Sequence, residues 1–267
     1  MGILFKRALK NLIYVAQIYM GVDEMAKKIN MTLEEVKAFL AEYHDENRAK
    51  IYVKHEESTE GEFLGIKIAD LKKVLKMTKK NYELSKQLFD TGVYDYMYLA
   101  GLMGDEKLMT KEEACHWIEH AKYNTVAEYA VSWLVSETPY AIELAAKYVD
   151  SDIDREKAIA WSIYSNHLAL TEDDNIDKNL IFELLGRVER TIHDESNRCK
   201  YCMNNFVIAV AAFYEPLLEE SKFVADNIYK VDVYVGKTSC KVPYAVEYIK
   251  KLEDKNKIGK KKKTVRC

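Results

Sequence analysis

Glycine and proline are scarce in this chain, with 10 and 3 residues among 267. Strand-rich proteins need such residues at their turns, so the shortage argues against a sheet or barrel fold. Only residues 231–235 form a short run with clear β character. We therefore expect an almost entirely α-helical protein.

Long apolar runs are also missing. No stretch approaches the roughly 20 apolar residues that a membrane-spanning helix requires, and Lys6, Arg7 and Lys10 interrupt the apolar N-terminal segment. The five cysteines form an odd set without the spacing of a secreted disulfide scaffold, which predicts a reducing, cytoplasmic environment. Cys267 ends the chain, so it cannot form a prenylation motif.

The spacing of apolar residues along the chain has a strong helical periodicity. In residues 177–193, apolar residues recur at steps of three and four, which predicts a half-buried helix. Thr32 with Glu35, and Thr110 with Glu113, have the form of a capping box at a helix start. Further helices are expected to begin near residues 93, 124 and 154, at intervals of 31 and 30 residues. That register is typical of a stacked array of helical hairpins.

The array makes a specific prediction. Residues 78–230 should form at least four antiparallel helix pairs, because the connections at 105–109 and 151–153 are short. The second members of these pairs should share the concave side of the array. They are expected at residues 93–104, 124–137, 154–169 and 196–214.

Charge is distributed unevenly along the chain. The formal charge is −3, yet residues 255–267 contain seven Lys or Arg residues and no acid, so residues 1–254 carry −10. A nucleic-acid groove on this acidic body would have to be a local basic patch. The candidates are Lys157, Arg187, Arg190, Arg198 and Lys200, with Lys260, Lys261, Lys262 and Lys263 in the basic C-terminal tail. The alternatives are solvated helix-end cations and a tail that only aids solubility.

The chain reads as an N-terminal helical cap at 1–60, a repeat domain at 61–254 and a basic tail at 255–267, with no linker rich in Gly, Ser or Pro. Cys199 and Cys202 have the spacing of a metal or redox pair, and His116 and His120 share a helix face. Neither pair has an evident further ligand. We interpret them as packing thiols and polar surface residues, and expect no metal site.

Two segments resemble parts of the AlkD-type DNA alkylation repair superfamily. Residues 63–75, Phe-Leu-Gly-Ile-Lys-Ile-Ala-Asp-Leu-Lys-Lys-Val-Leu, are similar to the family's entry motif, in which a glycine turn leads into a helix beginning Pro-x-Leu-Arg. Ala69 stands where proline is usual. Residues 236–249, with Gly-Lys-Thr-Ser-Cys-Lys-Val-Pro-Tyr-Ala-Val-Glu-Tyr-Ile, and the closing residues 259–267 resemble the ending of one branch.

This resemblance implies an all-α, right-handed superhelical array of HEAT-like antiparallel helix pairs whose concave face grips double-stranded DNA. Active members excise positively charged N3- and N7-alkylated purines. An aspartate stabilises the developing sugar cation and positions water, and two tryptophans and an arginine contact the DNA. The carboxylate suits this chemistry because a fixed negative charge stabilises a cationic transition state. No metal or organic cofactor is implied.

Carried over position by position, the resemblance places the first aromatic on Tyr123 and the aspartate on Ala127. Alanine cannot perform that role. Glu128 is the adjacent acid, rotated by about 100° around the helix, and is expected to be a surface carboxylate. The family arginine falls near Lys157, and the second tryptophan falls within residues 204–208, where Phe206 is the aromatic residue. The candidate catalytic residues are therefore Glu128 and Tyr123.

Three functions remain open from the sequence. The first is a DNA-binding protein of the alkylation-repair superfamily that excises alkylated purines weakly or not at all, and that would be nucleoid-associated when bound. The second is a non-catalytic binder of damaged or branched DNA. The third, favoured by the acidic body, is a protein-binding helical solenoid. If DNA is the ligand, deleting residues 255–267 is expected to weaken binding and to reduce its salt dependence.

Overall fold

The computed structural model describes residues 30–56, 60–234 and 241–266, and within them the regular elements are helical. The N-terminal helices are α2 (Leu33–Leu40), α3 (Glu46–Glu56) and α4 (Ile68–Thr78). The outer helices are α5 (Tyr82–Asp90), α7 (Lys111–His120), α9 (Ala141–Tyr148) and α11 (Lys178–Thr191). The inner helices are α6 (Tyr94–Met103), η3 (Val126–Val131) continued by α8 (Ser132–Ser136), α10 (Asp154–Leu170) and α12 (Asn197–Phe213). The C-terminal helices are α13 (Leu218–Asn227) and α14 (Ala245–Asp254).

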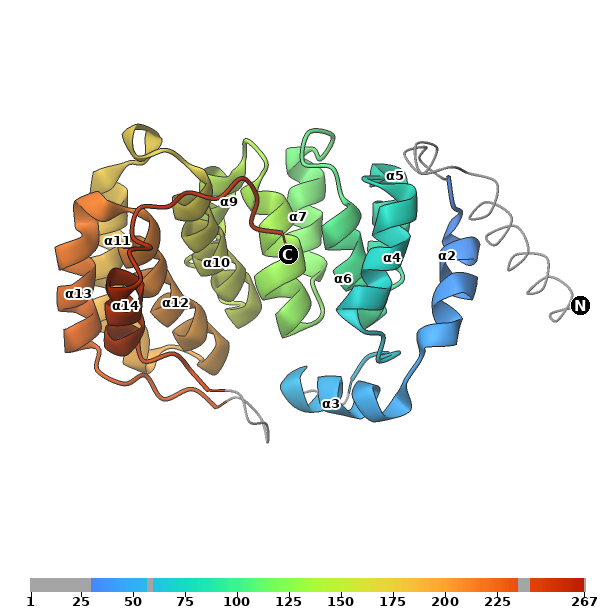
Figure 1. Cartoon of the computed structure of the whole chain (residues 1–267), viewed down its shortest axis with the longest axis horizontal. Helices are drawn as coiled ribbons and strands as arrows, with labels where there is room; N and C mark the ends of the chain where they lie inside the picture. Colours follow the sequence, from blue (N-terminus) through green and yellow to red (C-terminus); the bar gives the residue numbers. More distant parts are fainter. Residues whose placement is uncertain (1–29, 57–59, 235–240, 267) are drawn as a thin grey trace, which may run out of the picture.

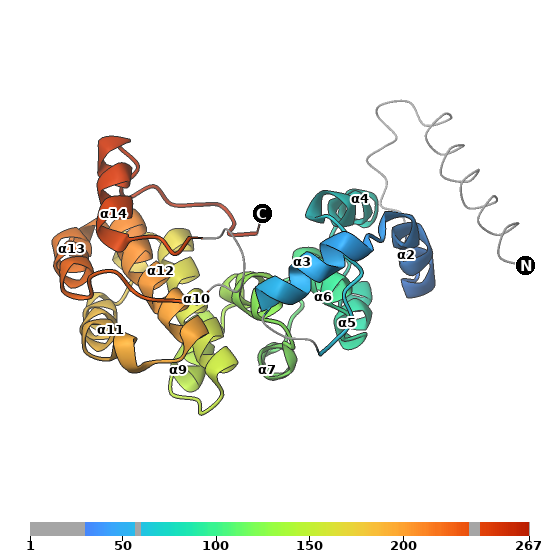
Figure 2. The ribbon, with the colours of Figure 1, turned by 90° about the horizontal axis from the view of Figure 1, so that it is seen from below.

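These helices form a single row of antiparallel pairs. Each outer helix is followed by an inner helix, and the inner helices pack against one another in chain order, α6 on η3, η3 and α8 on α10, and α10 on α12. Figure 2 shows the outer helices along one side of the row and the inner helices along the other. The predicted all-α array of helix pairs is confirmed, with α8 and α10 side by side as its register required.

The inner helices are buried because both neighbours and the outer layer cover them. All ten residues of α6 are buried, including three tyrosines. Gly101 allows the closest approach: a Cβ there would lie 2.4 Å from the carbonyl oxygen of Ala130 on η3. Segment η3 is a π-helical turn, an irregularity that often accompanies functional sites in helices. Both predicted capping boxes are present, at Thr32 and at Thr110.

The segment 60–67, which holds the start of the family-like entry motif, joins the N-terminal helices to the row. Asp95, in the first turn of α6, accepts backbone hydrogen bonds from Leu64 and Ile66, each at 2.7 Å. Gly65 adopts a φ of +70°, and a Cβ there would lie 2.1 Å from the carbonyl oxygen of Asp45. The motif's glycine is therefore required by a tight turn against the start of α3.

Helix α3 lies across the row rather than within it. Figure 1 shows it along the lower edge, beneath the ends of the inner helices. Its last residue, Glu56, is buried and accepts hydrogen bonds from the backbone N–H groups of Asn124 and Thr125. The start of the η3–α8 helix is therefore capped by a carboxylate from a distant segment. Residues 1–29 of the expected N-terminal cap lie outside the described residues.

Residues 255–266, here called the C-terminal strap, run along the opposite edge of the row (Figure 1). The Gly259 and Lys262 amides donate to the carbonyl oxygens of Ala212 and Ala169, at 2.9 and 2.7 Å. Arg266 reaches the carbonyl oxygen of Gly104, at the end of α6, and pairs with Glu106 and Glu137. The basic segment is thus packed on the body, which argues against the alternative of a loose tail that only aids solubility.

Two sequence expectations concern other element types. Residues 231–234 are extended but belong to no sheet, and the β pairing within the described residues is an isolated parallel bridge between Glu62 and Val93. Residue 235 lies outside the described part. Among the helices of the described ranges, none combines the length and the apolar character that crossing a membrane would demand.

Candidate nucleic-acid interface

The inner helices carry a cluster of half-buried aromatic side chains. The ring centroids of Tyr129 and Trp133 lie 5.5 Å apart, and Tyr98 meets Trp133 edge-on at 6.1 Å. The hydroxyl oxygens of Tyr129 and Tyr201 are 3.4 Å apart, which links η3 to α12. Since the outer layer covers the opposite side of the inner helices, the partly exposed rings of Tyr129, Trp133 and Tyr201 mark the open side of the row, and Tyr98 is buried beneath them. Arg198 adds a cation, with its guanidinium 4.7 Å from the Tyr201 ring centroid.

Glu128 lies beneath this cluster and is not a surface carboxylate as the sequence predicted. Only 4% of the residue is exposed, and both carboxylate oxygens accept hydrogen bonds from the Arg198 guanidinium. Burial raises the pKa of Glu128, and the pairing with Arg198 opposes that rise. Glu128 is buried because η3 packs between α6 and α10. Ala127, its neighbour in the same helical turn, is buried as well. The carboxylate is therefore committed to an internal ion pair.

Tyr123, the other candidate catalytic residue, is also committed to internal contacts. Its hydroxyl donates to the carbonyl oxygen of Gly92 at 2.9 Å and accepts from the amide of Glu62 at 3.1 Å. The ring packs against Phe63 and Tyr94, with centroids 5.0 and 5.3 Å away. Burial raises the pKa of the Tyr123 hydroxyl. Tyr123 thus joins the entry turn to α6 and is 97% buried.

The candidate basic residues separate into two places. Lys157 and Arg198 lie in the first turns of the neighbouring inner helices α10 and α12, and Lys200 follows on α12. Lys157 pairs with Glu195 at 2.8 Å and with Asp154 at 3.4 Å, so its charge is largely neutralised. Arg187 and Arg190 belong to the outer helix α11 instead. Arg187 pairs with Asp150 at 2.8 Å, whereas Arg190 is exposed.

The four lysines of the strap also differ among themselves. Lys261 is 14% exposed at its side chain, donates to the carbonyl oxygens of Leu168 and Phe213, and pairs with Asp173 at 2.7 Å. Lys260, Lys262 and Lys263 are exposed. Three of the four are therefore accessible to a phosphate, and Lys261 serves the attachment of the strap.

Of the two pairs of possible metal ligands, the cysteines are buried and the histidines are exposed. Cys199 and Cys202 are buried on α12, and Cys199 Sγ lies 3.7 Å from Met203 Sδ. Burial raises the pKa of both thiols, that of Cys199 to about 12. The His116 and His120 rings stack with centroids 4.2 Å apart. Within the described residues, no group of three His, Cys, Asp or Glu side chains is placed to hold a metal ion.

Known proteins share the sequence pattern and the architecture of this chain. The sequence model of the DNA alkylation repair enzyme family matches residues 36–249. The chain belongs to the DNA alkylation repair family. A protein of Listeria innocua without an assigned function is 31% identical over 228 residues, which cover 84% of this chain and 99% of the relative. A Listeria monocytogenes protein, also uncharacterized, is 31% identical over 231 residues, covering 85% and 100% of the two chains.

A solved structure is similar over nearly the whole chain. It was described as a new family of proteins related to the HEAT-like repeat DNA glycosylases with affinity for branched DNA structures. The two chains superpose with a TM-score of 0.80 and 31% identity, covering 89% of this chain and all of the other. This member of the DNA alkylation repair family therefore has the HEAT-like repeat fold that the sequence resemblance implied.

The aromatic cluster was not identified from the sequence. Tyr129 and Trp133 are four residues apart on an expected inner helix, and residues at that spacing share a helix face. The spacing of these two residues was therefore a signal in the sequence that could have identified part of the cluster. Tyr201 could not have been added, because its contact with Tyr129 joins helices 72 residues apart.

Proposed function

We propose that this member of the DNA alkylation repair family binds DNA along the open side of its inner helices, prefers branched DNA, and does not excise alkylated purines. The structural relative with affinity for branched DNA is the observation that carries the proposal. Its fold agrees with that of this chain, and the similarity covers 89% of this chain and all of the relative. The partly exposed rings of Tyr129, Trp133 and Tyr201 on the open side suit contact with sugars and unstacked bases at a branch point.

The absence of excision is inferred from the state of the carboxylates. The position that corresponds to the family's aspartate holds Ala127, which is fully buried. Glu128 is paired with Arg198, and freeing it would leave two unpaired charges in a largely buried place. A glycosyl cation requires a carboxylate close to the sugar. Glu128 does not meet that requirement in this arrangement.

Affinity should come mostly from phosphate contacts and should fall steeply with salt. The body of the protein is acidic and several of its candidate cations are paired. The exposed lysines of the strap and Lys200 are then the cations best placed to contribute. Deleting residues 255–267 would also remove the contacts of Lys261 and Arg266. Replacing Lys260, Lys262 and Lys263 by glutamine is the cleaner test of phosphate contact.

The experiment compares binding of a labelled four-way junction and of a linear duplex with the same arm sequence, at two salt concentrations. We expect tighter binding of the junction, and about five- to tenfold weaker binding for Trp133→Ala. The matched control is Phe223→Ala, which removes an exposed aromatic ring from the outer side of the row. Equal binding of junction and duplex would overturn the preference, and binding of neither DNA would overturn the function.

A parallel assay follows release of 7-methylguanine from an alkylated duplex. We expect no release above the rate of spontaneous depurination. Release by the unaltered protein would contradict the proposal, and loss of that release in Glu128→Gln without loss of folding would return Glu128 to a catalytic role.

A further inference from the structure

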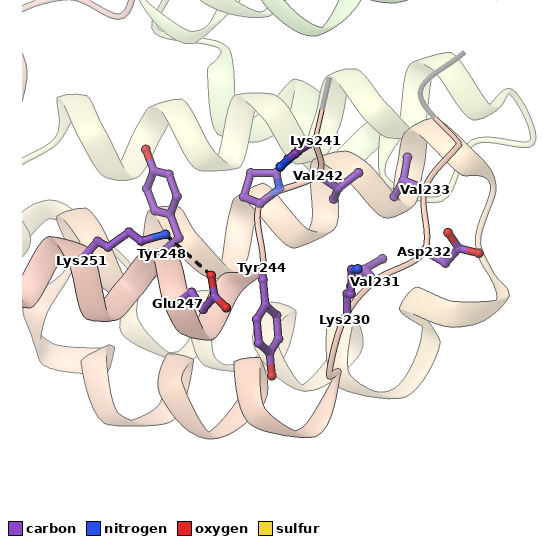
Figure 3. Close-up of a pocket in the computed structure, with 11 residues that line it drawn as sticks. Lys230, Val231, Asp232, Val233, Lys241, Val242, Tyr244, Glu247, Tyr248 and Lys251 are labelled. Carbon is purple, nitrogen blue, oxygen red and sulfur yellow. Dashed lines mark ion pairs between the residues drawn. The ribbon is translucent and has the colours of Figure 1, made fainter. Parts of the chain in front are cut away.

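A groove of about 770 Å³ lies at the C-terminal end of the row, between α14 and two extended segments. One segment is 230–233 and the other is 241–243, and neither side is a regular strand. Figure 3 shows the side chains of α14 on one side of the groove and those of residues 230–233 on the other. The volume falls within the usual range for binding sites, roughly 300–1,000 Å³.

Two asparagines hold the extended segments on α12. Asn197 accepts from the amide of Tyr234 at 2.7 Å and donates to the carbonyl oxygen of the same residue. Asn204 donates to the carbonyl oxygen of Pro243 at 3.0 Å. Both asparagines share a face of α12 with Tyr201, since the three residues are spaced four and three apart. The segments that line the groove are therefore attached to the same face of α12 as Tyr201 of the aromatic cluster.

One wall of the groove is the solvent-exposed face of α14. Tyr244, Glu247, Tyr248 and Lys251 follow the spacing of one helix face and line the groove. The opposite face, with Ala245 and Ile249, is buried against the body. Tyr248 is 45% exposed, so an aromatic face is available to a ligand.

The remaining lining combines cations with an apolar floor. Lys230 and Lys241 are exposed at the mouth, and Lys251 is 65% exposed at its side chain. Val231 and Val233 are buried below them. Two acids also line the groove: Asp232, and Glu247, which lies 3.7 Å from Lys251. The lysines outnumber the acids, so the groove is net positive on an otherwise acidic body.

We propose that this groove binds a single strand of DNA, the unpaired strand of a branched substrate. Tyrosine faces stack on any base, and lysines beside them contact the phosphates, which is the usual chemistry of sequence-independent single-strand binding. Stacking on Tyr248 requires a base released from its pair, so the groove would take unpaired DNA in preference to a duplex. The inference rests on the proposed DNA-binding function and names the part of the DNA that this groove takes.

The test uses the full chain and a labelled oligothymidylate, with a linear duplex of equal length and a fork with one unpaired arm. Tyr248→Ala should weaken binding of the oligothymidylate and of the fork by about tenfold, with the duplex unchanged. Tyr248→Phe should retain the affinity, because the ring face remains. The matched control is Tyr229→Ala, which removes a tyrosine that is 72% exposed but does not line the groove.

Lysines supply a second matched pair on one helix. Lys251→Ala should weaken single-strand binding and reduce the salt slope by about one. Lys250→Ala is the control, because Lys250 is exposed on the same helix, pairs with Asp254 and lies outside the groove. Photocrosslinking of a bromodeoxyuridine-containing oligonucleotide, mapped by mass spectrometry, should place the adduct on Tyr244 or Tyr248.

The outcomes distinguish a failure of the groove assignment from a failure of the proposed DNA-binding function. Tight junction and duplex binding without oligothymidylate binding would overturn the groove assignment and leave the proposed function standing. Equal weakening of all three DNAs by Tyr248→Ala would also overturn it, because the groove would then belong to a duplex surface. A protein that binds no DNA in any form would overturn both.

Discussion

The two edges of the inner-helix row are closed by opposite chemistry. At the lower edge, the carboxylate of Glu56 accepts the free N–H groups at the start of the η3–α8 helix. At the upper edge, Lys261 and Arg266 of the strap donate to the free carbonyl oxygens at the ends of α6, α10 and α12. Each charge matches the helix dipole at its own edge.

The comparison shows that the charges of this protein have structural partners that a count of charges does not reveal. Charges that the sequence offers as candidates for DNA contact or catalysis are used to complete the fold, as Lys261, Glu128 and Arg198 are. The two edges also differ in reach. One residue of α3 caps one inner helix, whereas a strap of a few residues contacts the ends of four.

The largest effect on the free energy of unfolding is expected at the ion pair of Glu128 and Arg198, which lies between the two edges. Glu128→Ala should reduce the free energy of unfolding by about 3–5 kcal/mol, because Arg198 would lose its buried partner. The double variant Glu128→Leu with Arg198→Met should recover much of that loss. Urea unfolding of the four proteins in the cycle measures the coupling. A loss below about 1 kcal/mol would mean that the pair is solvated, as originally expected for Glu128.

At the lower edge, Glu56→Ala should cost about 2 kcal/mol, since the start of the η3–α8 helix would lose its cap. Glu46→Ala is the control, because Glu46 is an exposed acid in the first turn of the same helix α3. Thermal and urea unfolding measure both variants. Equal losses for the two would show that the lower edge gains nothing special from a buried carboxylate.

At the upper edge, Arg266→Ala should cost about 1 kcal/mol, because this part of the strap can detach without opening the row. Hydrogen exchange at the Lys262 amide, which donates to Ala169, should accelerate in this variant. Lys263→Ala, at an exposed residue of the same strap, should leave exchange unchanged. Unchanged exchange in Arg266→Ala would show that the strap is held by its other contacts.

The smallest effect concerns pH, and its sign should differ between the edges. Burial raises the pKa of Glu56, against hydrogen bonds from Thr125 and Asn124. Burial also acts on Glu106, but Lys80 and Arg266 outweigh it and hold the pKa of Glu106 below its ordinary value of 4.5. The stabilising contribution of Glu56 is complete below pH 4.5 and is lost as pH rises through its folded-state pKa. That of Glu106 is present above pH 4.5 and is lost as pH falls through its folded-state pKa.

The measurement is urea unfolding of the wild type, Glu56→Gln and Glu106→Gln across acidic pH. The difference in free energy of unfolding between the wild type and Glu56→Gln should shrink as pH rises above 4.5. The difference between wild type and Glu106→Gln should shrink as pH falls below it. Slopes of the same sign would contradict the opposition between the two edges.

The sequence by itself determined the helical class, the register of the repeat and both capping boxes. The helical class and the capping boxes depend on residues within one or two turns of each other, and the register follows from where successive helices begin, so spacing along the sequence is sufficient to predict them. The family resemblance rested on the same kind of signal, the glycine turn at Gly65 and the helix that follows it.

Only the tertiary structure decided which charged and aromatic residues are available. Glu128 and Arg198 are 70 residues apart, and Arg266 meets Gly104 across 162 residues. A local sequence pattern cannot predict such contacts. A charged residue that stays exposed and one that pairs with a distant helix can stand in the same local sequence. The burial of Tyr123, the exposure of Trp133 and the groove beside Tyr248 likewise follow from how the helices stack.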